Sequence, residues 1–166
     1  MWEAPGAEEE KQERPFCGEA GFLLESILRQ VGLRREEVYI TNVVKVRPPE
    51  NKIERLPELG LAISEFIPQL KEELEKVKPN VVVALGALAL EVLTSEKGIM
   101  KWRGSIIESS LIPNLKVIPA IHPAAILRQY KWRPLLWLDM KKVVKEAYSS
   151  KIELPERNLK IGRAHV

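Results

Sequence analysis

The chain has 166 residues, of which 45% are apolar and 30% charged, with a formal net charge of +3 and a single cysteine. This length and composition are typical of one globular domain. They exclude a disordered chain and a small domain held together by disulfides. The small positive charge permits nucleic-acid binding without requiring it, so any basic surface must come from local clusters of lysine and arginine.

The sequence contains no targeting or membrane-spanning pattern. No apolar run approaches the ~20 residues that cross a bilayer, and no signal peptide is visible. A lone cysteine fits a reducing compartment. We therefore expect a soluble, cytoplasmic protein.

The chain opens with a loop that leads into a helix. Pro5 restricts one φ angle and Gly6 frees the next, which predicts a tight turn, and a second turn is expected at residues 15–18. An apolar pattern with helical spacing then predicts a helix over residues 21–31, ended by Gly32.

Strand-like and helix-like segments alternate after this first helix. Runs rich in β-branched residues predict buried strands, and apolar residues three or four apart predict helices. The expected elements are strand 38–44, loop 45–57, helix 59–77, strand 81–85, helix 87–93, a short strand pair within 100–108, strand 116–120 and helix 135–148. This alternation predicts an α/β fold of three layers, α/β/α, with a central and mainly parallel sheet.

Two loops at strand ends are candidate parts of a binding site. Ligands of such sheets bind at the carboxyl ends of the strands, where Asn42 and His122 are expected. Glu3 would join them if a strand preceded it. Each residue also has a purely structural interpretation. Asn42 would then cap a turn, His122 would be a hydrogen-bonded turn residue before proline, and Glu3 would be an exposed acidic residue.

Three motifs resemble those of the uracil-DNA glycosylase superfamily, in particular its iron–sulfur type, family four. They occur in the family's order between residues 3 and 147, and three ordered motifs are far more specific than one. The matching segments are EAPG at 3–6 with RPFCG at 14–18 (family G-E-A-P-G and G-x-P-F-V-G-x-A-G), TNVVKVRPP at 41–49 (family T-N-V-V-K-C-R-P-P) and HPAAILR at 122–128 (family H-P-[SA]-x-x-L-R).

The resemblance implies a DNA repair enzyme that flips uracil out of DNA and hydrolyses its N-glycosidic bond, leaving an abasic site. It implies that Glu3 and His122 are catalytic. Glu3 would orient a water or stabilise positive charge that builds on the sugar, and His122 would donate a hydrogen bond as charge develops on the departing uracil. Asn42 would read the uracil edge with its amide. Phe16 would stack on the base, and Ala4, Pro5 and Gly6 would complete the pocket; simple core burial is the alternative for Phe16.

DNA contacts are expected from two further segments. Lys45 and Arg47 resemble phosphate contacts, with solvated surface charge as the alternative. The resemblance places Arg128 in a loop that enters the minor groove, with Leu127 as a wedge in the vacated stack. Trp132 lies between Lys131 and Arg133, which suits a nucleic-acid surface but equally suits helix packing.

The chain departs from the family where a metal cluster would be bound. The family uses four cysteines, and Val46 and Phe66 occupy two of those positions here, while the other pair would precede Met1. Cys17, which stands where the family has valine, cannot hold a cluster alone. We therefore predict no iron–sulfur cluster and no other metal or cofactor, with residues 48–70 packed hydrophobically and Val46 in contact with Phe66.

The two ends of the chain are also unusual. Family members have a strand before the first motif, and Trp2 replaces the motif's first glycine, so we expect a truncated start and a missing central strand. We assign residues 1–150 to the glycosylase-like domain and 151–166 to a tail, whose last six residues resemble translated sequencing adapter. We expect a monomer, with self-association through the exposed sheet position if that strand is missing.

Two other functions remain open at this stage. A catalytically degenerate member could bind DNA or a protein without cleavage, which Trp2 and the absent strand favour. An unrelated nucleotide-binding α/β module could use Gly86 and Ala87 as a phosphate turn, although neither glycine-rich phosphate motif is present.

Overall fold

The computed structural model describes residues 1–13 and 17–149, so the predictions for Phe16 and for the tail at 151–166 lie outside the described residues. Its centre is a mixed sheet with the strand order β1-β3-β2. β1 (Val81–Leu85) runs parallel to β3 (Lys116–Ala120), and the short β2 (Ile107–Glu108) pairs antiparallel with β3. The α/β prediction is confirmed.

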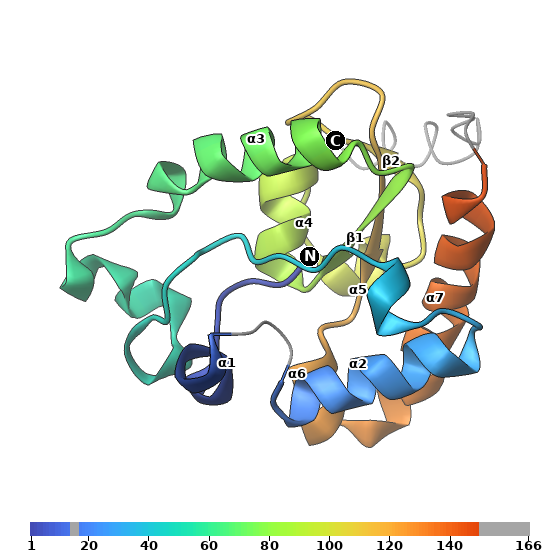
Figure 1. Ribbon diagram of the computed structural model, residues 1–166, viewed down its shortest axis with the longest axis horizontal. Helices are drawn as coiled ribbons and strands as arrows, with labels where there is room; N and C mark the ends of the chain where they lie inside the picture. Colours follow the sequence, from blue (N-terminus) through green and yellow to red (C-terminus); the bar gives the residue numbers. More distant parts are fainter. Residues whose placement is uncertain (14–16, 150–166) are drawn as a thin grey trace.

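Helices cover both faces of this sheet (Figure 1). One face carries α2 (Glu19–Gln30), α6 (Pro123–Arg128) and α7 (Arg133–Ala147), and the other carries α3 (Ile67–Val77) and α4 (Ala87–Thr94). Each face has its own buried apolar cluster. The α2/α6/α7 cluster includes Leu85 and Ile118 of the sheet, and the α3/α4 cluster includes Val82 and Val117. This arrangement is the expected three layers, because strand side chains alternate between two covered faces.

Two short helices lie outside these layers, α1 (Ala7–Gln12) and α5 (Ile99–Trp102). Short 3-10 helices occur at Arg35–Glu37, Pro49–Asn51, Ile53–Leu59, Ile63–Glu65 and Tyr130–Trp132. No helix in the described part of the chain is long and apolar enough to span a membrane.

The strand predicted at 38–44 is not formed as such. Only an isolated parallel bridge joins Trp2 to Asn42, with Trp2 N donating to Thr41 O at 3.0 Å and Val43 N donating to Trp2 O at 2.9 Å. A strand needs a neighbour to pair with, and the segment 1–3 reaches only residues 41–44. Residues 38–40 have suitable side chains but no strand beside them among the described residues.

Two other expected elements differ from the structure. The helix predicted over 59–77 is interrupted, because Gly60 adopts a left-handed conformation (φ +71°) and α3 begins only at Ile67, just before Pro68. The strand pair predicted within 100–108 is wrong in its first half, which forms α5, while residues 107–108 pair with β3. The strands at 81–85 and 116–120 are confirmed at both ends.

Leu70 anchors α3 on the sheet and is fully buried, whereas Leu59 is 49% exposed. We expect Leu70→Ala to lower the free energy of unfolding by about 2–5 kcal/mol, because it removes buried methyl groups and leaves a cavity. The matched control Leu59→Ala should change it by less than about 0.5 kcal/mol. Urea unfolding followed by circular dichroism measures both, and equal losses would contradict this account of the α3/α4 cluster.

Candidate active site

Three segments meet at Gly86, which directly follows β1. Gly86 N donates to Ala120 O at 3.0 Å, at the end of β3. A Cβ on Gly86 would lie 2.7 Å from Glu3 Oε1 and 3.3 Å from His122 Cβ, and the residue has a φ of +95°. Position 86 therefore requires glycine for two reasons: its backbone conformation disfavours other residues, and a side chain would collide with Glu3. The sequence pattern identified Gly86 as a turn and missed that it brings Glu3 and His122 together.

Glu3 is held by the first turn of α4. Its Oε1 accepts a hydrogen bond from Leu88 N at 3.2 Å, and its backbone carbonyl accepts from Val44 N at 2.9 Å. Burial raises the pKa of the Glu3 carboxyl, and the Leu88 hydrogen bond partly offsets that rise. The carboxylate is thus fixed in position at the carboxyl end of the sheet.

His122 caps α6 with its imidazole. Nδ1 accepts from Ala124 N at 3.0 Å, so in the neutral ring the proton is on Nε2. The Trp2 ring lies edge-on to the imidazole, with centroids 4.0 Å apart. Burial, followed by the positive N-terminus and Arg128, lowers the pKa of His122 to about 4. His122 is therefore a neutral hydrogen-bond donor at physiological pH.

Asn42 lies beside this pair because it is the residue bridged to Trp2. Directly paired residues place their side chains on the same face, and Trp2 in turn contacts His122. The Asn42 carbonyl accepts from Lys45 Nζ at 2.6 Å. Its side-chain amide makes no hydrogen bond within residues 1–13 and 17–149, which leaves one donor group and one acceptor available.

The predicted pocket residues Ala4, Pro5 and Gly6 connect Glu3 to α1. Ala4 packs against the α3/α4 cluster, and Gly6 is the N-cap of α1. A Cβ on Gly6 would lie 2.7 Å from Glu9 Oε2, and Glu9 Oε1 accepts from Gly18 N at 3.1 Å. Glu9, which sequence reasoning missed, thus links α1 to the start of α2.

The four predicted DNA contacts fall into two groups. Lys45 pairs with Glu73 at 2.8 Å, and Arg47 pairs with Glu10 at 3.0 Å. Leu127 and Arg128 are exposed at the end of α6, and Arg128 has no ion pair in the described part of the chain. Phosphate binding by Lys45 or Arg47 stays a prediction and would have to compete with these carboxylates.

The two positions that correspond to the family's cluster ligands are apolar. Phe66 is buried in the α3/α4 cluster, and Val46 packs against that cluster; a direct contact between the two stays a prediction. The described residues contain no group of three side chains able to hold a metal, and Cys17 is half-buried. These side chains do not fit an iron–sulfur cluster, which requires thiolate ligands.

The lowered pKa of His122 predicts a pH dependence of stability. Between the ordinary pKa of 6.5 and the folded value of about 4, the unfolded chain takes up a proton that the folded chain does not. We expect stability to fall with decreasing pH across this window, by up to about 1.4 kcal/mol per pH unit from this residue. Urea unfolding should show a shallower slope for His122→Gln, and equal slopes would contradict a neutral buried imidazole.

The family model for the uracil DNA glycosylase superfamily matches residues 3–148. A type-4 uracil-DNA glycosylase of Thermotoga maritima is 47% identical over 128 residues, which cover 76% of this chain and 64% of that protein. Those of Archaeoglobus fulgidus and Sulfurisphaera tokodaii are 38% and 36% identical, over 85% and 90% of this chain and 72% and 69% of their own lengths. The chain thus spans about two-thirds of these relatives (64–72%). It belongs to the uracil-DNA glycosylase superfamily.

Proposed function

We propose that this chain is a uracil-DNA glycosylase that releases uracil by hydrolysing the bond between uracil N1 and the sugar C1′, leaving an abasic site. The observation that carries the proposal is the approach of Glu3 and a neutral His122 on the two sides of Gly86. The names of the relatives support uracil in DNA as the substrate. Membership in the superfamily overturns the alternative of an unrelated nucleotide-binding module.

Recognition would begin with a uracil flipped out of the base stack. The Asn42 amide offers a donor and an acceptor, which match the O4 carbonyl and the N3–H of a uracil edge. Thymine carries these same two groups, so the Asn42 amide alone does not select against it. The stacking role of Phe16 lies outside the described residues and stays a prediction.

Bond cleavage would use His122 and Glu3 together. As the C1′–N1 bond breaks, its electron pair moves onto the uracil ring, and the charge that develops on O2 accepts a hydrogen bond from His122 Nε2–H. A water oriented by Glu3 attacks C1′, and its proton passes through the carboxylate to solvent. Uracil leaves as an anion and is protonated by solvent. A neutral imidazole can take this role, because its Nε2–H donates while Nδ1 accepts from Ala124 N.

The residues in the cluster positions bear on the protein's metal requirement. Val46 and Phe66 offer no ligand atoms, so we expect the purified protein to be active without iron and to lack the visible absorbance of an iron–sulfur cluster. Iron found in stoichiometric amount would contradict this part of the proposal.

A second candidate is a catalytically degenerate protein that binds DNA without releasing uracil. The packing of the Trp2 ring against His122, at the position of the motif's glycine, favours it. The two candidates differ in one observable, the release of the base.

We expect Asn42→Ala and His122→Ala to slow uracil release by at least about 100-fold, since each removes a hydrogen bond that strengthens as charge develops. The assay is alkali-induced strand cleavage at a single uracil in a labelled oligonucleotide. Gln69→Ala, which removes an exposed amide from α3, should leave the rate unchanged. DNA binding without any cleavage by the unchanged chain would establish the degenerate binder instead.

Leu127 and Arg128 should affect binding in different ways. Arg128→Ala should weaken DNA binding and reduce the slope of log K against log salt by about one, because one phosphate contact is lost. Leu127→Ala should reduce affinity for duplex uracil DNA more than for single strands, since a wedge matters only in a stack. Fluorescence anisotropy measures both, with the exposed Lys97→Ala as control. An unchanged slope for Arg128→Ala would remove it from the interface.

A further inference from the structure

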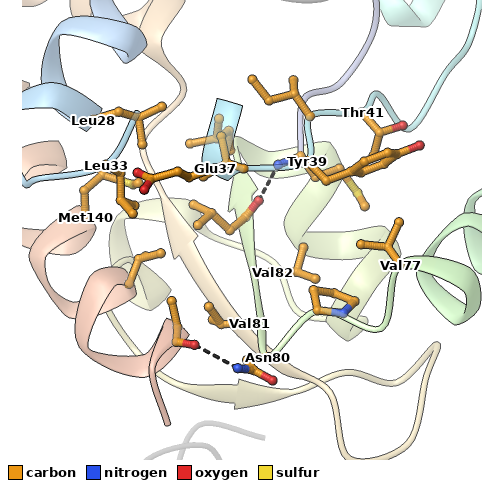
Figure 2. A pocket seen from close by; sticks show the side chains of 18 of the residues that line it. Leu28, Leu33, Glu37, Tyr39, Thr41, Val77, Asn80, Val81, Val82 and Met140 are labelled. Carbon is orange, nitrogen blue, oxygen red and sulfur yellow. Dashed lines mark hydrogen bonds between the residues drawn. The ribbon is translucent and has the colours of Figure 1, made fainter. Parts of the chain in front are cut away.

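A hydrogen-bonded network joins the segment that contains Asn42 to helix α3. Lys45 Nζ donates to Asn42 O at 2.6 Å and to Thr41 Oγ1 at 2.6 Å. It also pairs with Glu73 Oε1 at 2.8 Å, and Thr41 Oγ1 donates to Glu73 Oε2 at 2.6 Å. Figure 2 shows Thr41 on the same side of a cavity as Val77, which belongs to α3. We call the side chains of Thr41, Lys45 and Glu73 the Lys45 network.

These contacts use the full hydrogen-bonding capacity of the Lys45 ammonium group. An ammonium group has three N–H donors and no acceptor, and the acceptors here are a carbonyl, a hydroxyl and a carboxylate. The Lys45 side chain is 20% exposed, whereas that of Lys76 on the surface of α3 is 74% exposed. A DNA phosphate would have to displace one of these acceptors to bind Lys45. The geometry therefore favours an internal role for this lysine.

The backbone of Asn42 receives a hydrogen bond from this network. Residues 43–46 form neither helix nor strand, and no backbone N–H donates to the Asn42 carbonyl within residues 1–13 and 17–149. Lys45 Nζ is therefore the donor that fixes this peptide group. The short asparagine side chain moves its amide along with any shift of the backbone, so the same hydrogen bond bears on where the amide lies.

Glu73 connects the Lys45 network to the core. Leu70 and Leu74 flank Glu73 on α3 and are buried in the α3/α4 cluster, which holds the helix on the sheet. The two oxygens of the Glu73 carboxylate are divided between Lys45 and Thr41. The position of the 41–45 segment is thereby fixed relative to the core and not only by its own turns.

We propose that Lys45 and Glu73 are positioning residues for uracil recognition, which hold the Asn42 backbone so that its side-chain amide faces the base edge. This inference rests on the proposed function, in which the Asn42 amide reads uracil. A displacement of about 1 Å in such a group can cost about 100-fold in rate. Lys45 then acts through Asn42, in place of the phosphate contact that the family resemblance implies.

A double-mutant cycle on uracil release tests whether Lys45 acts through Asn42. We expect Lys45→Met, which keeps the apolar stem and removes the ammonium group, to lower kcat/KM at least about tenfold. In the Asn42→Ala background the same change should cost less than about twofold, because the amide that Lys45 holds is already gone. Lys45→Met should also leave the slope of log K for DNA binding against log salt unchanged.

Two outcomes of this cycle would overturn the proposal. Equal losses in both backgrounds would show that Lys45 acts independently of Asn42. A salt slope reduced by about one would instead make Lys45 a phosphate contact.

A second variant separates positioning from folding. Removal of one partner from this largely buried ion pair leaves an uncompensated charge, so Lys45→Met is expected to lower stability as well. Lys45→Met combined with Glu73→Gln leaves no such charge, and the amide oxygen introduced at position 73 still accepts from Thr41. We expect this double variant to melt within about 4 °C of the unchanged chain and to release uracil at least about tenfold more slowly. Full activity of the double variant would contradict the proposal.

Nuclear magnetic resonance gives a readout that does not require catalysis. The side-chain NH2 signals of Asn42, identified by their loss in Asn42→Ala, should shift or broaden in Lys45→Met and in Glu73→Ala. The matched control Glu72→Ala, which breaks an exposed ion pair with Lys76 on the same helix, should leave them unchanged. Signals that stay in place in Lys45→Met and Glu73→Ala would overturn the proposal. If the unchanged chain releases no uracil, the proposed function fails, and these signals still decide whether the Lys45 network positions Asn42.

Discussion

The pairing of residues 1–3 between β1 and residues 41–44 is the constraint on which the rest of the structure depends. It fixes Glu3 beside Gly86, and it brings Trp2 into contact with His122 and Asn42 into register with Trp2. Three motifs that are far apart in sequence are thereby gathered at one end of the sheet. A few backbone hydrogen bonds thus assemble the candidate active site.

Burial then decides the chemistry of the gathered groups. His122 is kept neutral, because a charged imidazole would lose its hydration and would lie near the positive N-terminus and Arg128. The same burial raises the pKa of Glu3, although the Leu88 amide holds the carboxylate in place. A neutral donor and an oriented carboxylate at one sheet edge suit a reaction in which negative charge builds on a leaving base. The basic residues at 45 and 47 serve internal ion pairs in this structure, whereas Arg128 remains at the surface.

Local sequence predicted the elements that depend on local pattern. The runs VVVAL and KVIPA are covered on both faces, and both strands form at the expected residues. The run at 38–44 is likewise rich in β-branched residues, yet it forms only a bridge, because strand formation depends on a neighbour that composition does not reveal. The helix expected over 59–77 is interrupted for a local reason. Gly60 adopts a left-handed conformation, and α3 begins only at Ile67, just before Pro68.

The sequence by itself determined the family and the candidate site residues, because three motifs in the family's order carry that information without coordinates. Glu3, Asn42 and His122 could be named as candidates in this way. Only the tertiary structure decided what surrounds them, such as the Leu88 amide on Glu3 and the Trp2 ring on His122, and it also added the hydrogen bond from Gly18 to Glu9. The physical reason is that burial, pKa and hydrogen-bond partners depend on residues distant in sequence, whose approach is set by packing and not by spacing along the chain.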